Sequence, residues 1–131
     1  MTTNIDYIKT EFEYSELTKI VGRPSYQSLK KIFDECAANA SQITSRLGGG
    51  LHGLLGLVLI ATQYALVSAV PFVRLTSPGA FVIPAGPGIT NMHRETARDN
   101  HKERVRVFNE CNAVEKALIK LITQAVPETY I

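Results

Sequence analysis

Apolar residues recur at every third or fourth position between residues 25 and 45, which is the spacing of one helix face. Pro24 marks a boundary, and Ser25 can cap the first turn because its hydroxyl accepts a hydrogen bond from a free backbone N–H. Three glycines at residues 48–50 disfavour a longer helix. The pattern predicts a helix over residues 25–45 with this apolar face: Leu29, Ile32, Phe33, Cys36, Ala37, Ala40 and Ile43.

A second helical pattern covers residues 91–125. Thr90 can cap this segment, and Pro127 follows it. Its first half is highly charged, whereas its second half carries an apolar face. Because a single helix of this length is unusual in a small domain, we expect a break near residues 109–112, between an exposed helix and a buried one.

The stretch between these two patterns is almost uncharged. Residues 51–92 carry one charged side chain, Arg74, whereas acidic and basic residues are nearly balanced on either side. Apolar residues dominate residues 51–69, which predicts an apolar helical segment there. Residues 72–89 contain three prolines without backbone donors and three glycines, so they are predicted to form a long Pro/Gly loop.

These segments predict one all-α domain over residues 1–131. Residues 1–22 have only a weak pattern and are expected to form a short extended N-terminal arm. The helices are expected to make a small multi-helix bundle, and a chain of this size can bury one core without staples. We expect the core to contain Leu29, Ile32, Phe33, Cys36, Leu55, Leu59, Tyr64, Phe108, Leu118, Leu121 and Ile122.

The composition is that of an ordinary globular protein, with 45% hydrophobic and 20% charged residues. A net charge of +2 argues against a nucleic-acid or membrane-surface binder driven by bulk charge. Cys36 and Cys111 match no zinc or redox spacing and are expected to be reduced, buried thiols. The N-terminus carries acidic residues and lacks an apolar signal segment, so we expect a cytoplasmic protein.

A membrane span is the alternative interpretation of the apolar segment. Residues 51–72 are long enough to cross a bilayer, which takes about 20 apolar residues. Glycines crowd one end, however, and no cluster of lysine or arginine marks either flank. We therefore interpret the segment as part of a buried core and expect no membrane partner.

Residues 48–53 match a Gly-rich nucleotide-binding pattern literally, but a helix and not a strand precedes them. We interpret them as a structural corner at which helices pack closely, formed by Gly48, Gly49, Gly50, His52 and Gly53. The rival hypothesis is a small ligand-binding or catalytic domain, with a pocket at residues 48–56 and a lid formed by residues 72–89. We find no candidate catalytic, cofactor-binding or metal-ligating residues, and we expect neither an enzyme nor a cofactor.

Four segments together resemble one family. They are LTKIVGRPSYQSLKKIFDECAANASQI (residues 17–43), GGGLHGLLGLVLIATQYALV (residues 48–67), the Pro/Gly loop, and NAVEKALIKLITQAVPETYI (residues 112–131). This combination is similar to the Gag region of copia-type LTR retrotransposons. The resemblance implies a helical, non-enzymatic domain like a retroviral capsid N-terminal domain, which assembles with copies of itself into a ring or particle shell.

The resemblance also implies which parts of the chain carry that function. We expect the chain to be part of a longer Gag protein, with nucleic acid bound only by segments outside it. The polar face of the first helix and the charged stretch of the second are the candidate assembly surfaces. Their residues are Lys30, Lys31, Asp34, Arg94, Arg98, Lys102 and Arg106.

Overall fold

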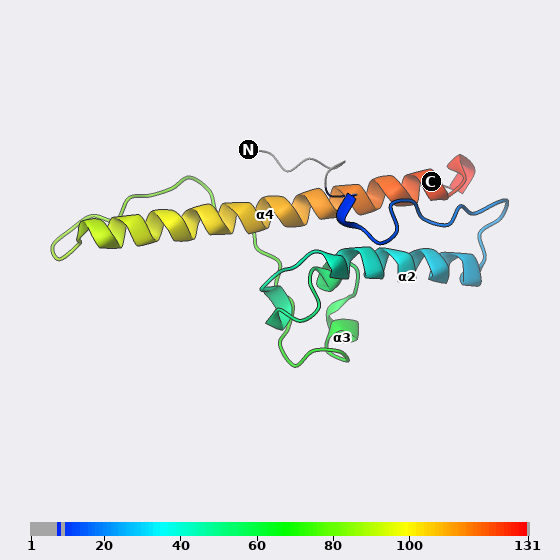
Figure 1. The fold of residues 1–131 in the computed structure, drawn as a ribbon, viewed down its shortest axis with the longest axis horizontal. Coiled ribbons are helices and arrows are strands. Elements are labelled where there is room, and N and C mark those ends of the chain that lie inside the picture. The colour runs from blue at the N-terminus through cyan, green and yellow to red at the C-terminus, as the bar shows by residue number, and fades with distance from the viewer. Residues whose placement is uncertain (1–7, 9, 131) are drawn as a thin grey trace.

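The computed structural model describes residues 8 and 10–130. Within these residues the regular structure is helical and contains no strand, so the predicted all-α class is confirmed. The elements, labelled as in Figure 1, are α2 (Tyr26–Gln42), α3 (Ala61–Tyr64), α4 (Asn91–Ala125), and three short 3-10 helices, η1 (Leu47–Gly49), η2 (Leu55–Leu57) and η3 (Glu128–Tyr130).

Helix α2 begins at a reciprocal serine cap. The Ser25 hydroxyl accepts from the Ser28 N–H (3.1 Å), and the Ser28 hydroxyl accepts from the Ser25 N–H (2.8 Å). These bonds satisfy donors that the first turn would leave free. The helix ends at Gln42, three residues before the predicted end, because Ile43 adopts an extended backbone.

Helix α4 is continuous over its 35 residues, so the break predicted near residues 109–112 is wrong. Residues there have interactions that suit a helix. Cys111 is fully buried, Glu110 lies 3.3 Å from Arg106 one turn earlier, and Asn112 accepts a hydrogen bond from Arg74 (2.6 Å). Every buried residue of α4 lies between Cys111 and Ala125. The N-terminal half of the helix extends well beyond α2 (Figure 1).

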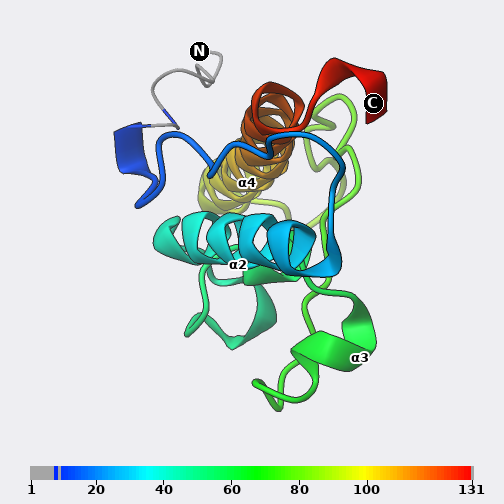
Figure 2. The same ribbon diagram turned by 90° about the vertical axis from the view of Figure 1, so that its right-hand side faces the viewer.

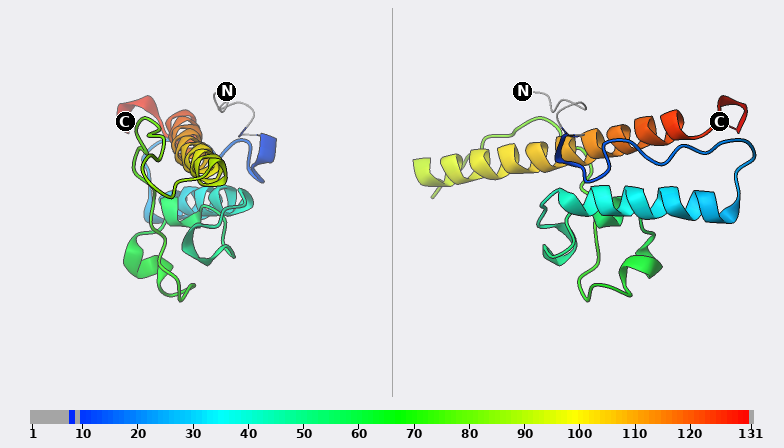
Figure 3. Two further views of the ribbon diagram at one scale, coloured as in Figure 1. Left: turned by 90° about the vertical axis from the view of Figure 1, so that its left-hand side faces the viewer. Right: turned by 45° about the vertical axis from the view of Figure 1, so that its right-hand side comes forward.

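The chain forms three layers around the C-terminal half of α4. Helix α2 crosses that half, and residues 47–71 form a lobe, most of which lies on the side of α2 that faces away from α4 (Figures 2 and 3). The N-terminal arm runs between α4 and α2 (Figure 1). The largest fully buried side chains are Tyr64, Leu54, Leu121, Val114, Asn39 and Cys111.

The lobe is less helical than predicted, because the sequence pattern indicated an apolar helical segment over residues 51–69. Within residues 51–69 only η2 and the four-residue α3 are helical, and turns connect them. Gly53 has a positive φ of +54°, which interrupts a helical path. Residues 72–89 carry no helix or strand and pass along the N-terminal half of α4 (Figure 1).

One charged residue fastens the Pro/Gly loop to α4. Arg74, the single charged side chain of residues 51–92, pairs with Glu115 and donates to the Asn112 side chain. Further along the loop, the Phe81 ring lies 5.3 Å from the His101 ring, and the Arg98 guanidinium lies 5.9 Å from the Phe81 centroid. The loop therefore lies against α4 at two separate places.

The core prediction is wrong at three positions. Leu29, Phe33 and Ile122 are exposed, by 49%, 39% and 37%. The apolar stripe of α2 is wider than the surface that α4 covers, and two polar side chains, Glu35 and Asn39, are buried beside it. Of the other expected core residues, Leu55, Leu59 and Phe108 are half-buried, and these are buried: Ile32, Cys36, Tyr64, Leu118 and Leu121.

Candidate functional site

Gly48 lies at the centre of the glycine corner. Its carbonyl accepts hydrogen bonds from the Tyr64 hydroxyl (2.8 Å) and the Ser68 hydroxyl (3.1 Å). Gly48 has φ +62°, and a Cβ there would lie closer than 3.0 Å to the buried Tyr64 ring. Only glycine fits this backbone and this close approach.

Gly53 joins the lobe to the end of α2. A Cβ at Gly53 would lie closer than 3.0 Å to the carbonyl oxygens of Ser41 and Ile43. The next residue, Leu54, donates its N–H to the Ala40 carbonyl (3.0 Å), which also accepts from the N–H of Ile43 at the end of α2 (3.3 Å). His52 completes the corner, with Nε2 donating to the Val67 carbonyl (3.0 Å).

Side chains fill the interior of the corner, where the rival hypothesis placed a pocket. The Tyr64 and Phe72 rings lie 5.7 Å apart, and a Cβ on Gly56 would lie closer than 3.0 Å to Phe72. The Pro/Gly loop continues away from the corner and lies against α4 at Phe81. Gly49 and Gly50 are exposed at the edge of the corner. This geometry favours a structural role for the corner.

The expected charged assembly residues lie in two separate places. Lys30, Lys31 and Asp34 are exposed on α2. Lys30 Nζ lies 3.0 Å from Asp34, and this hydrogen bond raises the pKa of Lys30. An exposed pair of this kind contributes little to stability or binding.

The second charged group lies on the N-terminal half of α4, where Lys102 is exposed. Arg106 pairs with Glu103 (2.8 Å) and Glu110 (3.3 Å), and the hydrogen bond to Arg106 lowers the pKa of Glu103. Arg94 donates to the Asn91 side chain (3.1 Å), and Arg98 lies over Phe81. Most of these charges are engaged within α4 and its loop, which leaves them poorly suited to carry an interface alone.

The sequence interpretation missed an apolar groove between α2 and α4. It has a volume of about 380 Å³. It opens on the side where Leu29, Phe33 and Ile122, which were predicted to be buried, are exposed. Glu115, the one charged residue in its lining, pairs with Arg74. The signal was present in the helical stripe of residues 25–45, which the sequence pattern assigned entirely to the core. The lining is Leu29, Ile32, Phe33, Cys36, Leu57, Val58, Glu115, Leu118, Ile119 and Ile122.

The lobe presents a second apolar surface. Residues 47–71 contain no Asp, Glu, Lys or Arg. Leu51 and Leu66 are 85% and 86% exposed, and three further apolar side chains of the lobe, Ile60, Val67 and Val70, are exposed as well. Exposed apolar surface of this extent on a small domain is typical of protein interaction sites.

Both cysteines are buried and free, and burial raises the pKa of each thiol. For Cys36 the value reaches about 11, because desolvation and the neighbouring Glu35 charge both disfavour the thiolate. Since the folded pKa lies above the unfolded one, this group's contribution to stability is lost as the pH rises from about 9 to about 11.

We therefore expect the urea midpoint to fall between pH 8 and pH 11, and to fall less steeply in Cys36→Ala. Ellman's reagent should leave both thiols unreacted until the chain unfolds, because only an accessible thiolate attacks it. The prediction would be contradicted if the urea midpoint fell equally with pH in the parent chain and in Cys36→Ala. Rapid reaction of the folded parent chain with Ellman's reagent would also contradict it.

No protein-family model, curated protein or solved structure matches the chain. In the described part of the chain, no helix combines the length and the apolar character that crossing a bilayer requires. The same residues contain no cluster of three or more potential metal ligands among His, Cys, Asp and Glu. The resemblance to Gag proteins therefore remains a hypothesis that stands on the quoted residues.

Proposed function

We propose that this chain is a self-associating structural protein, a capsid-like shell subunit of the kind that retroelement Gag proteins supply, and that it works in the cytoplasm without enzymatic activity. The resemblance of its residues to copia-type Gag motivates the proposal. The observation that carries it is the coexistence of two unlike apolar surfaces on one small molecule, the groove between α2 and α4 and the uncharged lobe.

The groove of one copy is a suitable site for the lobe of another. Exposed Phe33 and Ile119 line the groove, and Leu66 and Leu51 project from the lobe. Neither surface carries an unpaired charge, because Glu115 is already engaged by Arg74. Burial of one large apolar side chain contributes about 1.5–3 kcal/mol before the costs of association, so each contact is weak alone.

A contact between two unlike surfaces repeats from copy to copy. Such a heterologous interface closes into a ring if the rotation permits and otherwise continues as an open array. Weak contacts suffice in either case, because every subunit repeats them and avidity accumulates. This is the behaviour that a shell subunit needs, and apolar contacts replace the charged surfaces that the sequence suggested.

Two variants test the proposal, because each should remove one surface and leave the other intact. Phe33→Glu places a charge in the groove, and Leu66→Glu places one on the lobe. We expect the parent chain to form oligomers at high concentration in light scattering and electron microscopy, and each variant alone to form no ring, shell or other extended oligomer. Val82→Glu, at an 81% exposed position of the Pro/Gly loop, should assemble like the parent.

Mixing the two variants gives a sharper test. Phe33→Glu keeps a functional lobe and Leu66→Glu keeps a functional groove, so the mixture should form one-to-one dimers that grow no further. A mixture that stays monomeric would contradict a contact between unlike surfaces. A parent chain that stays monomeric at every concentration, or a Phe33→Glu chain that assembles normally, would contradict the proposed function.

A further inference from the structure

The N-terminal arm, residues 8 and 10–20, is held by α2 and α4 without regular pairing to either. Four of its apolar side chains, Ile8, Phe12, Leu17 and Ile20, are buried in the shared core. The arm passes between the two helices and meets α2 through a turn at its far end (Figure 1). It therefore completes the core as a separate piece of chain.

Two side chains of α2 bind the arm by its backbone. The Asn39 amide donates to the Tyr14 carbonyl (2.9 Å) and accepts from the Tyr14 N–H (2.8 Å). One helical turn earlier, the Glu35 carboxylate accepts from both the N–H and the hydroxyl of Thr18 (2.9 Å each). At the end of the arm, the Ile20 N–H donates to the Ala125 carbonyl (2.8 Å). These bonds do not depend on which copy of the chain supplies the arm.

The linker between the arm and α2, residues 21–23, is exposed and can change its conformation. Val21 is 93% exposed, and Gly22 has φ +76° with open space where a Cβ would lie, since no neighbouring atom comes within 4 Å of that position. Arg23 is exposed as well. Rotation about the Gly22 backbone can therefore redirect the arm without a clash within the linker itself.

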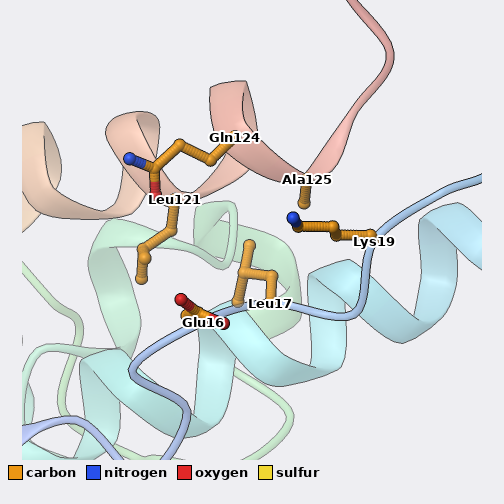
Figure 4. A pocket seen from close by; sticks show the side chains of 6 residues that line it. All are labelled: Glu16, Leu17, Lys19, Leu121, Gln124 and Ala125. Atoms are coloured by element: carbon orange, nitrogen blue, oxygen red, sulfur yellow. The ribbon is translucent and has the colours of Figure 1, made fainter.

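The arm also packs incompletely against α4. A hollow of about 310 Å³ remains between the two, lined by Glu16, Leu17 and Lys19 of the arm and by Leu121, Gln124 and Ala125 of α4. Figure 4 shows these side chains on opposite walls of the hollow. Release of the arm therefore breaks fewer contacts with α4 than it would if the interface were fully packed.

We propose that the arm of one copy occupies the arm site of a second copy, so that two chains exchange arms. The same apolar anchors and the same bonds to Asn39, Glu35 and Ala125 form in the exchanged and the closed states. The two states then differ mainly in the linker conformation and in the cost of association, which makes exchange dependent on concentration. This contact uses residues other than the groove and the lobe, and it gives the chain a second way to join copies.

Crosslinking across the hollow detects exchange directly. Glu16 and Gln124 are exposed, so Glu16→Cys and Gln124→Cys place reactive thiols on opposite walls without disturbing the core. The two single variants are mixed at high concentration, incubated, and treated with a short bis-maleimide. Only an arm seated in a second copy brings the two thiols together, so we expect a covalent heterodimer. The buried native thiols should not react.

Three controls make the outcome decisive. The double variant Glu16→Cys/Gln124→Cys should crosslink within one chain when dilute. A mixture of Glu16→Cys with Glu95→Cys, an exposed site on the far half of α4, should give no heterodimer. Deletion of residues 21–23 removes a linker that spans at most about 10 Å, so the arm can no longer reach its own site and the chain should become dimeric.

The proposal would be overturned if Glu16→Cys/Gln124→Cys crosslinked within one chain but the mixture of the two single variants gave no covalent heterodimer. A monomeric deletion variant would overturn it too, whether or not the crosslinker spans the hollow. Oligomers that depend on Phe33 but show no arm crosslink would leave the proposed function intact and reject arm exchange. Arm crosslinks that persist in Phe33→Glu would support exchange independently of the groove.

Discussion

Replacing Gly53 with alanine is expected to lower the free energy of unfolding by roughly 2–5 kcal/mol. The left-handed backbone costs an alanine about 1–2 kcal/mol. Overpacking adds about 1–3 kcal/mol, because the new methyl group would meet the Ser41 and Ile43 carbonyl oxygens at the end of α2. Both oxygens belong to backbone, which cannot move aside as a flexible side chain can. Urea denaturation followed by circular dichroism measures the loss.

Gly79→Ala is the matched control. Gly79 also has a positive φ, +70°, but a Cβ there would meet no atom within 4 Å. This variant should therefore show only the cost of the backbone conformation, about 1–2 kcal/mol. Equal losses in the two variants would mean that the lobe moves away from α2 at little cost, and that the corner is not a rigid junction.

Replacing Asn39 with alanine should destabilise the chain by about 2–4 kcal/mol and release the arm. The fully buried amide makes two hydrogen bonds to Tyr14, and its loss leaves a backbone N–H and a carbonyl without their partners. Limited proteolysis should then cut the arm at Lys19 much faster than in the parent. Gln42→Ala, at an exposed position of α2, should change neither stability nor cleavage.

Asn39→Asp separates hydrogen bonding from packing. Ionised aspartate keeps the size of the side chain but cannot donate to the Tyr14 carbonyl, whereas the protonated acid can. The folded state should therefore raise the pKa of this carboxyl group. Its contribution to stability is then present at low pH and lost as the pH rises through that raised value. A variant whose stability relative to the parent does not change with pH would contradict the assigned bond.

Local signals in the sequence predicted local structure well. Ser25 and Thr90 begin α2 and α4, and each helix starts with the reciprocal cap that such a residue can form. The corner predicted at Gly48 and Gly53 is also a tight junction in the structure, because a Cβ at either glycine would meet an atom closer than 3.0 Å. The caps depend on neighbours three residues apart, and the glycines mark flexible backbone whatever their partners, so one sequence suffices to predict both.

Features that depend on distant partners were not predicted. Phe33 fits an apolar helix face equally well whether the face is covered or lines a groove, and only the position of α4 decides between them. Glu35 and Asn39 look like solvent-exposed polar residues until the arm is seen to bind them. The expected break in α4 relied on the usual length of helices, whereas Arg74 and the core support the helix through residues 109–112.

The half of α4 that extends beyond the core can amplify small movements within an assembly. Residues 91–110 precede the first buried residue of the helix and span about 30 Å at 1.5 Å per residue. A tilt of about 5° where the helix leaves the core would displace the far end by roughly 2.5 Å over that length. Small packing changes near Cys111 would thus be amplified at the tip. If neighbouring copies meet there, such changes would alter the curvature of the array that they build.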